Sequence, residues 1–264
     1  MDQVFAVDGD TLAYRTAAVC EDHFEGAAYS ILASTLREIA TETGITKFRL
    51  YISGKSNFRY DIAKTKPYKG NRATMVRPRY LEACKNHLCE KYGAIVVDGY
   101  EADDAIATDM TLTGAYHCGV DKDILQIAGK HYNYVKKEWI TISEEEATLR
   151  LYRQILMGDT SDNIPGLPRV GEKIAHDTIQ DASTALQDAM AKYEEVVSLR
   201  MPGVNWLEYM AEQMELVRMR RDLELYCIDF NTFTIVEPNS EGFESHEGGM
   251  VATAEPIAKR SLKL

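Results

Sequence analysis

The sequence predicts an α/β fold in which a central, mostly parallel sheet is flanked by helices. Short apolar runs alternate with segments of helical spacing through the first half of the chain, which is typical of this class. Acidic residues closely follow three of these runs, and ligands bind at the carboxyl ends of the strands in open α/β sheets. The apolar run 3–7 is followed by Asp8, the run 94–97 by Glu101, and the run 115–120 by Asp121.

Each element follows from its spacing and its ends. The expected strands are 3–7, 48–52, 94–97 and 115–120, with 132–135 and 138–142 as a hairpin or edge pair. The expected helices are 27–43, 79–92, about 101–110, 143–156, 184–199 and 206–225. Gly44 and Gly93 end the first two helices, and Ser143 with Glu146 forms a capping box for the fourth. A polar, glycine-rich tail follows Val236.

The composition is that of ordinary globular material. The 264 residues are 45% hydrophobic and 27% charged, enough for one large or two modest domains. No run approaches the roughly 20 apolar residues of a membrane helix, so we expect a soluble, cytoplasmic protein without a membrane partner. The odd number of cysteines and their spacing favour reduced thiols over disulfides or zinc. They are Cys20, Cys84, Cys89, Cys118 and Cys227.

The net charge of −11 argues at first against a nucleic-acid partner, but the charge is unevenly distributed. The segment 53–79 is strongly basic, and Asp61 alone opposes its cations. These are Lys55, Arg59, Lys64, Lys66, Lys69, Arg72, Arg77 and Arg79. Phe58, Tyr60 and Tyr68 are interleaved with them, as a strand-tracking surface requires. The segment is too long for an ordinary connection, which favours a functional loop or mobile arch; the alternative is a solvated loop.

The acidic residues indicate a metal site when taken together. Asp8, Glu101, Asp103, Asp104, Asp121 and Asp123 all come just after predicted strands. Carboxylates that converge on one crevice repel one another unless cations neutralise them. Acidic residues also favour helix N-termini for reasons of capping and dipole, which is the alternative for Glu101, Asp103 and Asp104.

The segment 157–175, MGDTSDNIPGLPRVGEKIA, combines two features. Asp159 and Asp162 provide two more carboxylates. Gly166 and Gly171 bracket a hairpin before a helix, where backbone N–H groups and Lys173 suit a phosphate. The alternative is that the acids cap turns and the glycines end helices.

Five motifs in the same order resemble those of the 5′-nuclease family. This family comprises flap endonucleases, phage 5′-3′ exonucleases and the 5′-nuclease domain of bacterial DNA polymerase I. The motifs are VDGD, NFRxxxxxxxPYKGNR, EADDAIA, VDKD and GDTSDNIPGLPRVGEKIA, and they cover residues 4–178. The phage enzymes are the most similar.

The resemblance implies a PIN-like sheet, a helical arch at about 53–80 and a helix-hairpin-helix (helix-three-turn-helix) region. One metal would be held by Asp8, Glu101, Asp103 and, through water, Asp104; a second would be held by Asp121, Asp123, Asp159 and Asp162. Lys69 and Arg72 would bind the scissile phosphate. The DNA contacts implied are Arg59, Tyr68, Lys69, Arg72, Gly166, Leu167, Val170, Gly171 and Lys173, with Tyr68 stacking on a base.

The implied activity is phosphodiester hydrolysis by two Mg²⁺ ions, which Mn²⁺ can replace, with Asp8, Asp121, Lys69 and Arg72 as the catalytic residues. A K⁺ ion at the helix-hairpin-helix also fits the resemblance. The implied partner is DNA with a free 5′ end, flap or nick, and RNA–DNA hybrids are a further substrate class. The enzyme would act in replication or repair as a monomer, in the host cytoplasm if it is encoded by a bacteriophage.

The family usually has an aspartate after the second strand, where this chain has Ser53. Asp10 is a carboxylate that could compensate, and restoring the acid with Ser53→Asp should strengthen metal binding. Two alternatives to the nuclease remain: a DNA-binding member of the same fold that has lost its chemistry, and a PIN-type ribonuclease. The expected domains are 1–142 for the nuclease, 143–236 for the helical DNA-binding region and 237–264 for a flexible tail.

Overall fold

The computed structural model describes residues 3–223 and 233–238, and it confirms the α/β prediction. In this part of the chain seven strands form one sheet of order β3-β2-β1-β4-β5-β6, with β7 added against β2. The strands are β1 Val4–Asp8, β2 Lys47–Asn57, β3 Ile95–Gly99, β4 Tyr116–Cys118, β5 Gly129–Asn133, β6 Glu138–Ile142 and β7 Thr234–Ile235. The first five run parallel to one another, whereas β6 pairs antiparallel with β5 and β7 pairs antiparallel with β2. The strands β1, β2, β3 and β4 therefore direct their carboxyl ends to one edge.

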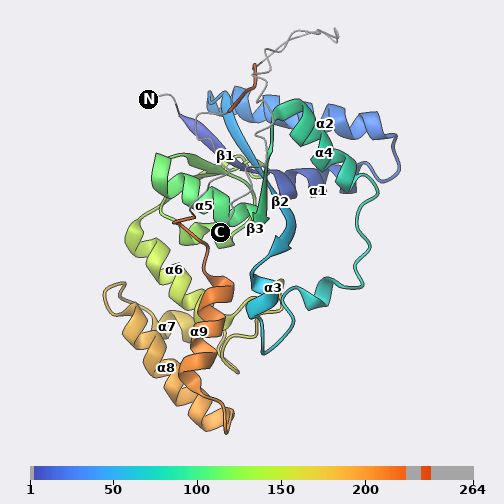
Figure 1. Cartoon of the computed structure of the whole chain (residues 1–264). Helices are drawn as coiled ribbons and strands as arrows, with labels where there is room; N and C mark the ends of the chain where they lie inside the picture. The colour runs from blue at the N-terminus through green and yellow to red at the C-terminus, as the bar shows by residue number, and fades with distance from the viewer. Residues whose placement is uncertain (1–2, 224–232, 239–264) are drawn as a thin grey trace, which may run out of the picture.

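Helices surround the sheet and form a separate group beside it (Figure 1). They are α1 Gly9–Val19, α2 Glu25–Thr43, α3 Arg59–Ile62, α4 Leu81–Tyr92, α5 Ala102–Thr113, α6 Glu144–Met157, α7 Glu172–Thr178, α8 Ala185–Arg200 and α9 Trp206–Val217. Gly44, Gly93 and Gly114 end α2, α4 and α5 in the left-handed conformation, with φ of 71°, 62° and 73°. Glycine adopts this conformation without a steric cost, which is why α2 and α4 stop where the sequence indicated. The helix α5 continues three residues beyond the predicted Met110, to Thr113.

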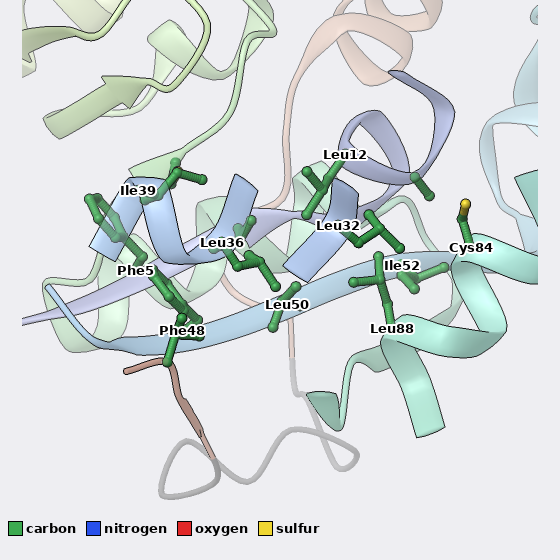
Figure 2. Close-up of a cluster of buried hydrophobic side chains, with 14 of the residues drawn as sticks. Phe5, Leu12, Leu32, Leu36, Ile39, Phe48, Leu50, Ile52, Cys84 and Leu88 are labelled. Atoms are coloured by element: carbon green, nitrogen blue, oxygen red, sulfur yellow. The ribbon is translucent and has the colours of Figure 1, made fainter. Parts of the chain in front are cut away.

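The two faces of the sheet have different cores. On one face α1, α2 and α4 pack on the strands through a cluster that includes Phe5, Leu36, Phe48 and Leu88 (Figure 2). On the other face α5 packs through Ile106 and its neighbours. No helix in the described residues is long and apolar enough to cross a membrane.

The helices α6 to α9 have a core of their own, which includes Ile155, Leu167, Tyr193 and Met210. Beyond the sheet, β2 continues to Asn57 and leads into the segment 58–80, which we call the arch. Figure 1 shows it running beside the helical group before it returns to α4. The arch contains only α3 and a short 3-10 turn at Gly70–Arg72, instead of a long helix.

Three elements differ from expectation. The sequence pattern did not indicate α1, whose apolar stripe is short, or β7. The pairing of β7 with Lys47 and Phe48 places Thr234 and Ile235 on the sheet, outside the helical region to which they were assigned. The last predicted helix ends at Val217. Most of the predicted tail and Cys227 lie outside the described residues.

Candidate metal centre and nucleic-acid interface

Four of the predicted ligands lie at the carboxyl edge of the sheet. Asp8 is the last residue of β1, Asp121 follows β4, and Glu101 and Asp103 stand at the start of α5, after β3. Asp8 caps α1 by accepting a 2.9 Å hydrogen bond from the Thr11 N–H. Parallel neighbouring strands bring residues that are far apart in sequence to one crevice, as predicted.

These carboxylates repel one another. Burial raises the pKa of Asp8 to about 6, although hydrogen bonds from Thr11 oppose the rise, and the negative charges of Asp10 and Asp121 add to it. Burial also raises the pKa of Asp103 well above its usual value, with further contributions from Asp8, Asp121 and Glu101. A cation placed among these oxygens would remove that repulsion.

A second group of carboxylates adjoins the first. Burial and the negative charges of Asp121 and Asp159 raise the pKa of Asp123 to about 8. The negative charge of Asp121 also raises the pKa of Asp8 and Asp103, and the Asp121 carboxylate accepts a 2.8 Å hydrogen bond from the Asp123 N–H. Gln154 of α6 donates a 2.8 Å hydrogen bond to Asp123. No sequence motif includes Gln154, and only its contact with Asp123 in the structure identifies it as part of the site.

The donor set suits hard divalent cations, because every candidate ligand is a carboxylate oxygen. As the side chains stand, no group of three or more His, Cys, Asp or Glu residues within 3–223 and 233–238 is arranged to hold an ion. The reason is that several carboxylates are turned toward protein donors. Asp159, for example, accepts 2.7 Å hydrogen bonds from both the N–H and the hydroxyl of Ser161.

Lys69 and Arg72 of the arch lie against the carboxylates. The Lys69 ammonium is paired with Glu101 and lies 3.7 Å from Asp162, and Arg72 is 2.5 Å from Asp162. The Lys69 N–H also donates to the Asp162 carbonyl at 2.8 Å. Both predicted phosphate-binding cations therefore lie at the predicted metal centre, where they neutralise its ligands.

The structure corrects the predictions for Asp104 and Arg59. Asp104 is fully buried, and its two oxygens accept 2.6 and 2.8 Å hydrogen bonds from the Arg59 guanidinium. Arg59 is only 3% exposed and also donates to the backbone carbonyls of Leu216 and Arg218. Each charge satisfies the other, so Asp104 is not free for a metal and Arg59 is not free for DNA.

Tyr68 does not present its ring for base stacking. It is 4% exposed and packs in the core of the helical group. Its hydroxyl lies 2.8 Å from a Glu101 oxygen and 2.7 Å from an Asp162 oxygen, and its single proton is shared between these two acceptors. Its neighbour Tyr60 is 55% exposed, with the two rings edge to face and their centroids 5.5 Å apart. The exposed aromatic side chain of this pair is Tyr60, which the sequence indicated only as one of three candidates.

Buried contacts hold the glycine hairpin in its conformation. A Cβ on Gly166, whose φ is 59°, would lie 2.3 Å from the Gly158 nitrogen. The Gly166 carbonyl accepts a hydrogen bond from the Tyr209 hydroxyl at 2.6 Å. Leu167 and Val170 are buried in the same core. These three residues shape the hairpin and are not exposed to DNA, whereas Gly171 and Lys173 at the start of α7 are exposed.

Ser53, which stands in place of the expected acid, bonds the start of α5, whose N-cap is Glu101 in a capping box with Asp104. Its hydroxyl accepts a 2.9 Å hydrogen bond from the Ala102 N–H, next to Glu101. A hydroxyl suits this position because the first N–H groups of a helix have no partner within it. Ser53 therefore holds α5 in place and supplies no negative charge.

This combination of a mostly parallel sheet, a carboxylate-lined edge and basic side chains directed at it defines an α/β protein suited to metal-assisted chemistry on phosphates. No family model matches the chain. It is 30% identical over 197 residues to the 5′-3′ exonuclease of Buchnera aphidicola, an alignment that covers 65% of this chain and 68% of that protein.

The chain is also 26% identical over 294 aligned positions to the thermostable DNA polymerase I of Thermus thermophilus, covering 97% of this chain and 34% of the polymerase. It thus spans about a third of the polymerase. The flap endonuclease of bacteriophage T5, solved with DNA and metal ions, has the same fold, with a TM-score of 0.59 at 18% identity over 82% of this chain and 86% of that one. The chain belongs to the 5′-nuclease family.

Proposed function

We propose that this protein is a structure-specific 5′ nuclease that hydrolyses DNA phosphodiesters with the help of two divalent cations. Mg²⁺ is the natural ion in this proposal and Mn²⁺ its substitute. The observation that carries the proposal is the meeting of two carboxylate groups at Asp121, with Lys69 and Arg72 directed at the same place. Membership of the family supports it.

Asp8, Glu101 and Asp103 would hold one cation, and Asp123, Asp159 and Asp162 the other, with Asp121 between them. When bound, the cations would supply an activated water and stabilise negative charge on the phosphate. Lys69 and Arg72 would leave Glu101 and Asp162 and bind the phosphate oxygens on which negative charge develops. Tyr68 would keep Glu101 and Asp162 oriented through its hydroxyl.

The DNA partner in this proposal carries a free 5′ end, a flap or a nick. The arch, through Tyr60, and the hairpin, through Gly171 and Lys173, would contact the single-stranded and duplex parts respectively. RNA–DNA hybrids are a further substrate class in this proposal, and a K⁺ ion would bind at the hairpin. The protein would act in replication or repair, as a monomer in the cytoplasm. We further propose that 1–142 forms the nuclease part and that α6 to α9 form the duplex-binding part.

The test is cleavage of 5′-flap, nicked and blunt DNA, and of single-stranded RNA, with Mg²⁺ and with product mapping. We expect cleavage of the DNA near the junction, with products that carry 5′-phosphates. Asp121→Asn should abolish cleavage, and Asp22→Asn, an exposed aspartate, is the control. Tight flap binding without cleavage would instead indicate a DNA-binding protein, and a preference for single-stranded RNA would indicate a ribonuclease.

A further inference from the structure

Asp10 is a carboxylate of the crevice that has no role in the mechanism above. It lies in the first turn of α1, two residues after Asp8, and its side chain is 27% exposed. One oxygen accepts a 2.9 Å hydrogen bond from the Ser53 N–H, and the other lies 2.6 Å from the Lys85 ammonium of α4.

These contacts place the Asp10 carboxylate beside Ser53. The Ser53 hydroxyl is turned to the start of α5, and Asp10 brings a negative charge to the Ser53 backbone, while Asp98 accepts from the Lys55 N–H two residues further along β2. Asp10 is thus two residues from Asp8 in the chain and contacts Ser53, whose hydroxyl bonds the first residue of the helix that carries Asp103.

We propose that Asp10 completes the first carboxylate group toward a divalent cation, in place of an acid at position 53, and that Lys85 balances its charge until the cation binds. This inference rests on the proposed function. Lys85 would play the part at Asp10 that Lys69 plays at Glu101, because each is a cation paired with a carboxylate of the crevice.

A purely structural ion pair is the competing explanation, because the Asp10–Lys85 contact also joins α1 to α4. The two explanations predict different changes in the affinity for metal when Asp10 or Lys85 is replaced. If Asp10 serves the cation, loss of Asp10 weakens metal binding whereas loss of Lys85 strengthens it, since Lys85 and the metal compete for one carboxylate. If the pair is structural, both losses destabilise the protein and neither changes the affinity for metal specifically.

The experiment is a Mn²⁺ titration of the full-length, DNA-free protein, with free Mn²⁺ measured by electron paramagnetic resonance. We expect Asp10→Asn to weaken Mn²⁺ binding about tenfold, a typical effect of a supporting carboxylate. Lys85→Met should bind Mn²⁺ several-fold more tightly, and Asp10→Asn with Ser53→Asp should regain most of the lost affinity. The matched controls are Asp22→Asn, an exposed residue after α1, and Lys91→Met, an exposed residue on α4.

Thermal unfolding without metal identifies variants that fail to fold. If Asp10→Asn does so, the proposal still requires Mn²⁺ to raise the melting temperature of Lys85→Met more than that of the wild type, and an equal rise overturns it. Wild-type affinity in a folded Asp10→Asn variant also overturns it. If only the proposal for Asp10 is wrong, the wild type still binds Mn²⁺ and cleaves flaps. If the proposed nuclease function is wrong, the wild type does neither.

Discussion

Lys69 has two successive roles at the residue scale. In the structure it neutralises Glu101 and lies near Asp162, and in the proposed reaction it would bind the scissile phosphate. We therefore expect Lys69→Ala to reduce turnover about a hundredfold, as the loss of a group that stabilises transition-state charge typically does. Affinity for the duplex should change much less, since the hairpin would supply those contacts.

Single-turnover cleavage and equilibrium DNA binding of the same flap substrate measure the two quantities. Lys66→Ala is the matched control, because Lys66 is an exposed lysine of the same segment. Equal losses of rate and affinity would contradict a role at the scissile phosphate.

Residue by residue, the sequence was most informative about which acids lie at the sheet edge. Asp8, Glu101 and Asp121 follow strands, so their location depends only on local pattern and parallel order. Arg59 and Tyr68 were predicted wrongly, because the partners of Arg59, Asp104 and Leu216, are 45 and 157 residues away in sequence. A basic run shows that cations are present, and it does not show which of them are paired inside the fold.

Helix α9 connects the arch to the hairpin at the scale of elements. The Glu212 carboxylate accepts 2.7 Å hydrogen bonds from the N–H groups of Lys64 and Thr65 at the base of the arch. From the next turn of the same helix, the Leu216 carbonyl accepts from Arg59. Two other residues of α9 contact Gly166 in the hairpin. The Tyr209 hydroxyl donates to the Gly166 carbonyl, and the Gln213 side-chain oxygen accepts from the Gly166 N–H.

We expect Glu212→Ala to loosen the arch without unfolding the protein. Two backbone N–H groups and the Thr65 hydroxyl lose their acceptor, while the buried core is unchanged. Limited proteolysis within 60–72 should become several-fold faster, with the melting temperature nearly constant. Glu208→Ala, which changes an exposed glutamate one turn earlier on α9, should leave the proteolysis rate as it is, and an equal acceleration in that control would count against this role.

Strands β4 and β5 contain a buried histidine pair that makes stability depend on pH. The Nδ1 atoms of His117 and His131 are 3.2 Å apart, and His131 Nε2 is 2.9 Å from the Ile127 carbonyl. Burial lowers the pKa of both side chains, and the field of Arg150 lowers that of His131 further. With both rings neutral, His131 donates to Ile127 and His117 donates to His131.

Below pH 6.5 the unfolded chain therefore binds protons that the folded protein does not, and stability falls as the pH falls. Each histidine contributes at most about 1.4 kcal/mol per pH unit between its lowered pKa and 6.5. Urea unfolding at pH 7.5 and 5.5 measures the change. The buried carboxylates with raised pKa values increase the stability as the pH falls, which opposes the effect of the histidines. The effect of the histidine pair is therefore measured by comparing variants. His117→Asn should lose less stability on acidification than the exposed His176→Asn, and equal losses would exclude the pair as the cause.

Among the elements, helices that end in glycine and strands with apolar runs were predictable because those signals are local. The helix α1 was missed because its apolar stripe covers little more than Leu12, Ala13 and Ala17. The strand β7 has only two residues, and its pairing with β2 comes from the fold, not from its own composition.

At the scale of the whole molecule, Lys69 and Arg72 join the arch to the loop of Asp162 through ion pairs. Lys69 and Arg72 neutralise carboxylates that the proposed cations need, and DNA would give these side chains another partner. Metal and DNA should therefore bind cooperatively, since each makes the arrangement required by the other more favourable.

The expected result is tighter Mn²⁺ binding, by several-fold, in the presence of a duplex whose linkages resist hydrolysis. Arg72→Ala should bind Mn²⁺ more tightly than the wild type without DNA, because a competitor for Asp162 is gone. Arg77→Ala, which affects only an exposed contact with Glu82, is the control. Unchanged or weaker Mn²⁺ binding by Arg72→Ala would disprove the competition.

The contacts of α9 also fix its rotational phase. Tyr209, Glu212, Gln213 and Leu216 are spaced i, i+3, i+4 and i+7, so they share one side of the helix. Inserting a single residue early in α9 would rotate this side by about 100°, which would separate the helix from the arch and the hairpin together. The helix can therefore vary in the identity of its exposed side chains, but not in the number of residues between its N-cap Asn205 and Leu216.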